Sequence, residues 1–331
     1  MLEFSLEVVR HASELTLQLQ KELVSVVLDK SDRSPVTVAD LAVQAYVAAK
    51  LEEYTPEIPL IGEESSDVFQ SEEGKKLLPV VTKYVQRFLP GKREDDICRW
   101  INRGQEQISS SEKFWTLDPV DGTKGFLRGQ QYAVALALVE NGVVKLGVLG
   151  CPSLSVEDIQ DGVLAYACRE QGAWITPLRE NSSEEGKKGN FSRRLHVSQE
   201  KEISQARILR SVESGHTNVS QLDVLMQKMK VCASPVQMDS QAKYVILADG
   251  KGDLLFRLLS AKMPDYEEKI WDQAAGSILL EEAGGKITDL DGKKLDFTQG
   301  RTLKKNRGIC ASNNFLHDAA IQALQELRSI S

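Results

Sequence analysis

Five short apolar runs between residues 114 and 176 constrain the fold more than any other feature of the sequence. They are Phe114–Leu117, Tyr132–Glu140, Val143–Gly150, Gly162–Cys168 and Ala173–Thr176. Asn141–Gly142 joins the second run to the third, and an Asn-Gly pair between apolar runs is a strong signal for a two-residue hairpin. Gln171–Gly172 separates the last two runs in the same way. The middle of the chain therefore predicts an antiparallel sheet.

The pattern changes near residue 200. Arg179–Arg194 is rich in Lys, Glu, Ser and Gly, which is typical of an exposed loop. Beyond Ile203, strand-like runs alternate with helical ones, as in α/β architectures. The strands are expected at 206–209, 254–258, 286–288 and 308–311, and the helices at 219–229, 241–248, 272–283 and 315–327. We expect a chain of mixed α+β and α/β character with two subdomains, residues 1–200 and residues 201–331.

Two helices are expected before the first strand. Apolar residues recur at helical spacing over Leu6–Leu28. Thr37 has the character of an N-cap for a second helix over Val38–Leu51, which would place Asp40 in the first turn. The short apolar run Ile58–Ile61 predicts a strand.

Charge and composition exclude several classes of protein. The chain has 41 Lys and Arg against 48 Asp and Glu, a net charge of −7, which argues against a broad nucleic-acid-binding surface. The five cysteines are odd in number and lack C-x-x-C spacing, so they predict neither a disulfide framework nor a zinc site. No run approaches the ~20 apolar residues of a membrane helix. We expect a monomeric, cytoplasmic protein that binds neither nucleic acid nor membranes.

The segment from Asp118 to Thr123 carries the strongest chemical signal. Pro119 restricts Asp118 to an extended conformation, and the following residues must turn sharply. Two carboxylates and a backbone carbonyl can then converge, and hard cations such as Mg²⁺ take oxygen ligands. Gly122 and Thr123 would offer backbone N–H groups to a phosphate. The same residues could also form a simple turn, because Asp, Pro and Gly are the standard turn residues.

Further acids are weaker signals when each is taken alone. Glu63 and Glu64 follow an apolar strand, where α/β proteins place functional side chains, but they could be a solvated pair. Asp272 would open an amphipathic helix and could be its N-cap. Asp40 could do no more than complement a helix dipole.

Four ordered blocks of the chain resemble the motifs of the lithium-sensitive inositol monophosphatase superfamily. They are Ser34–Asp40, Gly62–Ser66, Leu117–Phe126 and Trp271–Gly276, with Glu282–Gly285 after the last. Three other stretches resemble the 3′(2′),5′-bisphosphate nucleotidases within that superfamily: Lys124–Gly129, Asp239–Tyr244 and Glu268–Asp272. The resemblance implies a layered αβαβα fold, Mg²⁺-dependent phosphomonoesterase activity and inhibition by lithium.

The resemblance also implies a role for each matching residue. Two or three Mg²⁺ ions would be held by Glu63, Asp118, the Val120 carbonyl, Asp121 and Asp272. Asp40 and Thr123 would position and deprotonate the attacking water, without a covalent enzyme intermediate. The substrate would contact Gly122, Thr123, His216, Ser240, Lys243, Arg257 and Asp272.

The substrate implied is adenosine 3′,5′-bisphosphate, with its sulfated form as a second one. A fixed positive site for a second phosphate would distinguish a bisphosphate nucleotide from a monophosphate, because charge-assisted bonds to Lys and Arg reward the extra charge. Two alternatives use the same metal site, an inositol polyphosphate 1-phosphatase and an inositol monophosphatase. An alternative from another class is a non-catalytic nucleotide sensor.

Overall fold

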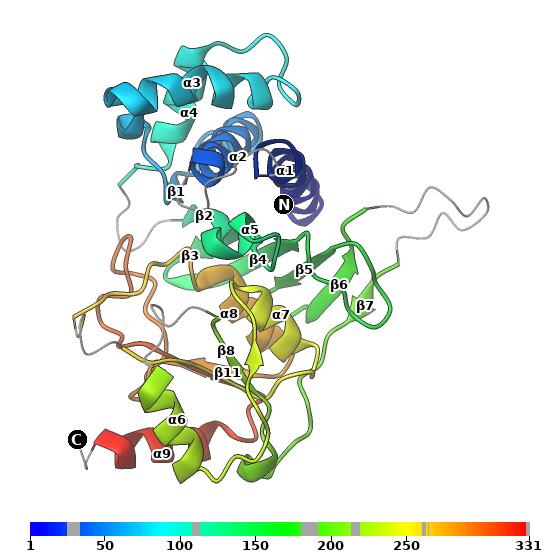
Figure 1. Ribbon diagram of the computed structural model, residues 1–331, viewed down its shortest axis with the longest axis vertical. Coiled ribbons are helices and arrows are strands. Elements are labelled where there is room, and N and C mark those ends of the chain that lie inside the picture. The colour runs from blue at the N-terminus through cyan, green and yellow to red at the C-terminus, as the bar shows by residue number, and fades with distance from the viewer. Residues whose placement is uncertain are drawn as a thin grey trace.

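The computed structural model describes residues 1–24, 34–107, 113–179, 191–212, 219–259, 263 and 265–328. These residues form five layers, in which two β-sheets alternate with three layers of helices (Figure 1). The layered αβαβα arrangement implied by the resemblance is therefore confirmed.

The first sheet has seven strands, which lie in chain order. They are β1 (Leu60–Gly62), β2 (Lys113–Asp121), β3 (Ala133–Glu140), β4 (Val143–Cys151), β5 (Val163–Cys168), β6 (Ala173–Pro177) and β7 (Arg193–Arg194). β1 is parallel to β2, and every later neighbour is antiparallel. Asn141 and Gly142 have φ angles of 52° and 72° between β3 and β4, as a two-residue hairpin turn requires. The predicted antiparallel sheet is confirmed.

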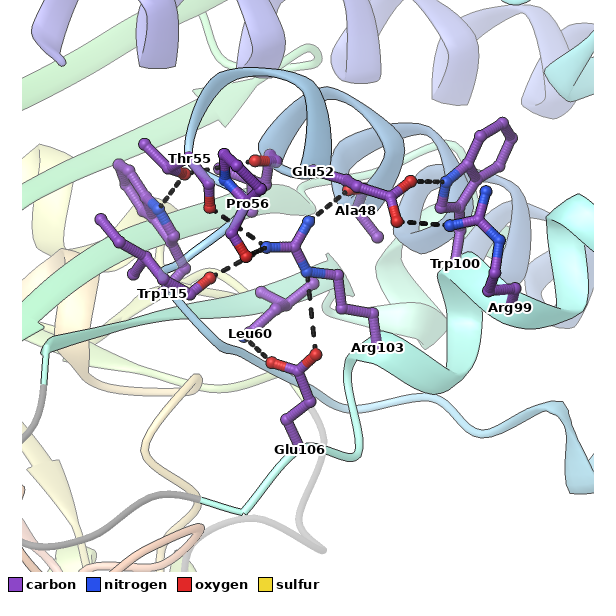
Figure 2. Close-up of polar contacts among 12 residues, drawn as sticks. Ala48, Glu52, Thr55, Pro56, Leu60, Arg99, Trp100, Arg103, Glu106 and Trp115 are labelled. Carbon is purple, nitrogen blue, oxygen red and sulfur yellow. Dashed lines mark hydrogen bonds and ion pairs between the residues drawn. The ribbon is translucent and has the colours of Figure 1, made fainter.

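Helices near the N-terminus cover the outer face of the first sheet. α1 (Leu2–Leu19) and α2 (Ser34–Tyr54) pack on it, while α3 (Glu72–Val85) and α4 (Glu94–Arg103) pack on α2 (Figure 1). Polar contacts fix α4 to α2, since the Trp100 indole N–H donates to Glu52 at 2.7 Å (Figure 2). The π-helical turn η1 (Gln20–Val24) follows α1, and the 3₁₀ turn η2 (Ser66–Gln70) precedes α3.

Three predicted boundaries were wrong. α2 begins at Ser34, so Thr37 is inside the helix instead of capping it, and Asp40 lies in the second turn. The first helix begins at Leu2 instead of Leu6; a π turn continues it to Val24, and the rest of the expected range to Leu28 lies outside the described residues. β2 continues through Asp121, whereas the sequence predicted that the strand ends before Asp118.

The second sheet has five strands in the order β11-β12-β10-β8-β9. They are β8 (Ile208–Arg210), β9 (Val236–Gln237), β10 (Leu254–Arg257), β11 (Lys286–Thr288) and β12 (Ile309–Ser312), and the 3₁₀ turn η3 (Ile203–Gln205) precedes them. α7 (Ala242–Ala248) and α8 (Ala274–Glu282) lie between the two sheets, and α6 (Val219–Lys228) and α9 (His317–Arg328) cover the far face (Figure 1). The predicted subdomain boundary at residue 200 falls between β7 and β8 and remains a prediction.

One large core joins the layers. It lies between the two sheets and takes buried side chains from β3 to β6, from α7 and α8 and from β10 to β12. None of the helices in the described ranges combines the length and the apolar composition that a bilayer span needs. All five cysteines are free thiols.

Candidate active site

A cleft of about 540 Å³ lies where β2 ends. α2, β2, the short helix α5 (Thr123–Leu127), α7, β10 and the segment before α8 contribute to its lining, so the cleft draws on both sheets. Eleven of the predicted site residues meet there: Asp40, Glu63, Asp118, Val120, Asp121, Gly122, Thr123, Ser240, Lys243, Arg257 and Asp272. The twelfth, His216, lies outside the described residues.

The parallel pairing of β1 with β2 makes Glu63 and Asp118 neighbours. Gly62 is in register with Leu117, so the next residue on each strand lies at the same edge of the sheet. Asp118 is only 2% exposed. Its Oδ1 atom is buried without a hydrogen-bond partner. This strand end therefore holds a buried carboxylate oxygen that can accept a further contact.

An irregularity in β2 brings Asp121 to the same cleft. The pairing of β2 with β3 shifts register between Asp118 and Asp121, which fits the missing N–H of Pro119. The chain then turns at Gly122, whose φ of 90° favours glycine. A Cβ atom at Gly122 would lie 2.9 Å from the Cβ of Ser240. Glycine thus allows the end of β2 to approach the segment before α7.

Gln241 connects the acids on the two sides of the cleft. Its backbone N–H donates to the carboxylate of Asp121. Its side-chain amide donates to the Trp271 carbonyl at 3.0 Å and accepts from the Gly276 N–H at 3.0 Å. Because Trp271 precedes Asp272, one residue fixes the approach of two acids. Sequence reasoning assigned Gln241 no role, and only its place in a matching motif pointed to it.

Asp40 reaches the cleft from α2. Its side chain is 5% exposed, and its Oδ1 atom is buried without a hydrogen-bond partner. Burial, followed by the charges of Glu64 and Glu63, raises the pKa of Asp40 well above its usual range. Thr123 begins α5 and lines the same cleft. A proton-accepting carboxyl group and an exposed hydroxyl in one cleft are suited to general-base chemistry.

Lys243 and Arg257 line the part of the cleft formed by α7 and β10. Lys243 is buried and donates from Nζ to Ser211 Oγ at 2.9 Å. Burial, aided by the charge of Arg257, lowers the pKa of Lys243 to about 8. The Arg257 Nε atom donates to Glu268 at 2.8 Å, and Nη2 lies 3.6 Å from Asp272 Oδ2. These cations give an otherwise acidic cleft a place for a second anionic group.

The acids of the cleft raise one another's pKa. Burial raises the pKa of Asp118, and the charge of Glu63 adds to the effect. Burial also raises the pKa of Asp272 to about 8, against the opposing charge of Arg257. The side chain of Glu63 is in contact with solvent in the cleft. Even so, partial desolvation of its carboxyl group raises the pKa of Glu63 to about 7, and the negative charge of Glu64 is the second largest cause. Bound divalent cations would relieve this repulsion.

The oxygen donors fit a hard divalent cation. Asp118 has a buried carboxylate oxygen without a hydrogen-bond partner, and such an atom costs free energy unless water or a cation contacts it. Carboxylates and carbonyls are the ligands that Mg²⁺ prefers. Among the described residues, no three Asp, Glu, His or Cys side chains already stand in a geometry that could hold a metal ion.

Without divalent cations, the protein should lose stability as the pH rises from about 5 to about 8. The pKa values of Glu63 and Asp272, about 7 and about 8, exceed those of the unfolded chain. The folded protein therefore keeps protons that the unfolded chain releases. The stabilisation that these protons give is fully present at low pH and is lost as the pH rises through the pKa values of the folded protein. Asp272 accounts for a loss on the order of a few kcal/mol, and Glu63 for less because water screens it.

Thermal unfolding in a chelator, followed across this pH range, measures the effect. Saturating Mg²⁺ should remove most of the pH dependence, because the cation takes the place of the protons. A melting temperature that rises with pH in the chelator would contradict the assigned pKa directions.

Comparisons with known proteins match the whole chain. The model of the inositol monophosphatase family matches residues 1–329. The 3′(2′),5′-bisphosphate nucleotidase of Schizosaccharomyces pombe is 35% identical, over 99% of this chain and 95% of its own. The 3′(2′),5′-bisphosphate nucleotidase 2 of Candida albicans is 36% identical, over 99% of this chain and 97% of its own.

Two solved structures are similar in fold. The IMPase of Thermotoga maritima superimposes with a TM-score of 0.64 at 19% identity and covers 99% of this chain and 98% of its own. The extragenic suppressor protein SuhB of Bartonella henselae gives a TM-score of 0.62 at 19% identity, with 98% of each chain covered. At this level of identity the structures establish the fold alone.

Proposed function

Because the chain belongs to the inositol monophosphatase family, we propose that it is a 3′(2′),5′-bisphosphate nucleotidase. It hydrolyses the 3′-phosphate of adenosine 3′,5′-bisphosphate to give adenosine 5′-monophosphate and phosphate, with the sulfated nucleotide as a second substrate. The curated relatives bear the name of this activity. The structural observation that carries the proposal is that Lys243 and Arg257 line the same cleft as the acids.

Enzymes of this family depend on Mg²⁺. We propose two or three ions, held by Glu63, Asp118, the Val120 carbonyl, Asp121 and Asp272, all of which line the cleft. When bound, Mg²⁺ supplies charge stabilisation at the phosphate oxygens and lowers the pKa of a water molecule. The unpartnered oxygen of Asp118 is the observation that supports this ligand set most directly.

The chain's own residues orient the substrate and move the proton. Asp40 accepts a proton from the Thr123 hydroxyl as that hydroxyl takes one from the attacking water, so the water attacks as hydroxide and its proton is held on Asp40. The backbone N–H groups of Gly122 and Thr123 bind the 3′-phosphate. Lys243, together with Arg257 and Ser240, binds the 5′-phosphate, and His216 remains a predicted nucleotide contact. The two phosphates thereby fix the nucleotide from both ends, which aligns the 3′-phosphate for in-line attack.

Lys243→Met should lower kcat/KM for adenosine 3′,5′-bisphosphate by roughly 10- to 100-fold, because one charge-assisted hydrogen bond is lost. The value for adenosine 3′-monophosphate should change little, since that substrate lacks the 5′-phosphate. Phosphate release in Mg²⁺ measures both. Lys251→Met is the matched control, because Lys251 is an exposed lysine paired with Glu157 at 2.9 Å outside the cleft lining.

A substrate panel tests the function itself. We expect the highest kcat/KM on adenosine 3′,5′-bisphosphate, well above inositol 1,4-bisphosphate and inositol 1-phosphate. Faster release from either inositol phosphate would contradict the proposal in favour of an inositol phosphatase. Nucleotide binding without phosphate release in Mg²⁺ would instead indicate the non-catalytic sensor.

Two coarser expectations accompany this proposal. We propose that the protein is monomeric and cytoplasmic. We also propose a subdomain boundary near residue 200, which is supported by the passage from the first sheet to the second between β7 and β8.

A further inference from the structure

Arg301 fixes the main chain next to one of the predicted metal ligands. It lies between β11 and β12, is half-buried and does not line the cleft. Its Nη1 atom donates to the carbonyl of Gly104 at 2.9 Å, and Nη2 donates to the carbonyl of Gly62 at 2.6 Å. Gly62 immediately precedes Glu63. The planar guanidinium group therefore joins the end of β1 to the residue that caps α4.

The same arginine contacts the residue before another predicted ligand. Its guanidinium carbon lies 4.8 Å from the centre of the Trp271 ring, a geometry in which a cation is attracted to an aromatic face. Its backbone carbonyl accepts from the Ile270 N–H at 3.2 Å. Trp271 immediately precedes Asp272. Arg301 thus joins two acid-bearing segments that are far apart in the chain, one directly after β1 and the other directly before α8.

Gln44 of α2 holds the end of β1 from another direction. Its Oε1 atom accepts from the Glu64 N–H at 2.9 Å, and its Nε2 atom donates to the Glu64 carbonyl at 2.7 Å. Gly62 and Gly104 leave room for this amide, because a Cβ atom on either would lie 2.4 or 2.5 Å from a Gln44 atom. The main chain around Glu63 is therefore held in place by Gln44, and Arg301 connects it to the main chain around Asp272.

We infer that Arg301 is a positioning residue for Mg²⁺ binding. Its contacts fix where Glu63 stands relative to Asp272, and that placement determines the affinity for the cation. The inference rests on the proposed function only in taking these two acids as ligands. The charge of Arg301 acts in the opposite direction, because a positive group near the site repels Mg²⁺. If Arg301 positions the ligands, its mutation weakens Mg²⁺ binding. If its charge were the main effect, mutation to a neutral residue would instead strengthen Mg²⁺ binding.

The test is isothermal titration of the full chain with Mg²⁺ in the absence of substrate. Arg301→Gln removes both the charge and the bridge between carbonyls, whereas Arg301→Lys keeps the charge and loses the bridge. Both variants should bind Mg²⁺ about 10- to 100-fold more weakly. Unchanged or tighter binding in either variant would overturn the inference.

Arg103 supplies a matched control at the other end of β1. Its guanidinium group donates to the carbonyls of Ala48, Thr55 and Ile58 at 3.3, 3.2 and 3.0 Å (Figure 2). Arg103→Gln removes a comparable set of contacts, so it should lower the melting temperature and leave the Mg²⁺ affinity unchanged. Equal weakening of Mg²⁺ binding in Arg103→Gln and Arg301→Gln would reveal a general loss of stability and overturn the inference.

The outcome is independent of the substrate. Melting curves in a chelator establish that each variant is folded before titration. A wild-type chain that fails to hydrolyse adenosine 3′,5′-bisphosphate would refute the proposed function, yet the Mg²⁺ affinities of the Arg301 variants would still decide the present inference.

Discussion

Asp118→Asn should reduce phosphate release by a factor on the order of 10³ while it raises the stability of the metal-free protein. Asp118 is buried at the end of β2, and burial raises its pKa before the charges of Glu63, Asp121 and Asp272 add to the effect. Asparagine has nearly the same shape but no charge, so it removes this repulsion. It also removes an anionic oxygen that Mg²⁺ requires.

Two measurements on the same variant check this prediction. Phosphate release in saturating Mg²⁺ gives the loss of turnover, and thermal unfolding in a chelator gives the gain in stability. Asp253→Asn is the control, because Asp253 is fully buried but paired with Arg207 Nε at 2.8 Å. That variant should lose stability and keep its turnover number. An Asp118 variant that melts earlier than wild type in the chelator would show that the acids do not repel one another.

Asp40→Asn should depress the turnover number by roughly 10²- to 10⁴-fold, the usual range for the loss of a general base. Asp40 is not among the predicted metal ligands, so Mg²⁺ affinity and KM should change far less. The buried, unpartnered Oδ1 atom of Asp40 is the feature from which this expectation derives.

Separate titrations distinguish the base from a ligand. The turnover number comes from phosphate release at saturating substrate and Mg²⁺, and the Mg²⁺ affinity from calorimetry. Glu64→Gln is the comparison, because Glu64 is the acid next to Glu63 in the sequence and does not line the cleft. This variant should lower the turnover number much less than Asp40→Asn does. An Asp40 variant with an unchanged turnover number would remove Asp40 from the mechanism, and a parallel loss of Mg²⁺ affinity would make it a ligand.

The sheet in the middle of the chain was predictable because its signals are local. The Asn141–Gly142 turn and the apolar runs on either side of it determine the hairpin and the pairing next to the turn, although the register shifts between Leu138 and Val139. The relation of the two sheets was not predictable in this way, because it depends on side chains of α8 that pack against both sheets and of α7 that pack against α8 and β10. The layered arrangement came from the resemblance to a family.

Proline misled the sequence reasoning at two places. The sequence predicts that the second helix begins after Thr37, but α2 begins at Ser34 and includes Pro35, because proline is well accommodated in the first turn of a helix. The sequence predicts that a strand ends before Pro119, but β2 continues through this residue, with a register shift between Asp118 and Asp121. Local preferences alone do not show whether a proline ends a helix or strand or lies within one.

The acids of the cleft could be identified from sequence, whereas the residues that hold them could not. Gln241 bonds to Asp121 across 120 positions of sequence, and Arg301 bonds to Gly62 across 239. No local pattern relates residues at such separations, and glutamine or arginine at an isolated position is an ordinary surface residue. Only the folded chain reveals these contacts.

The dispersal of the cleft's acids along the chain has a consequence for synthesis. A ribosome produces Asp40, Glu63, Asp118 and Asp121 with the first sheet, well before Asp272. A nascent chain that has folded only its N-terminal part therefore presents a set of acids without the last member and without Lys243 and Arg257. With the ligands and nucleotide contacts proposed above, phosphatase activity requires α7, β10 and the segment before α8 to be in place, so activity in a translation mixture should follow completed chains.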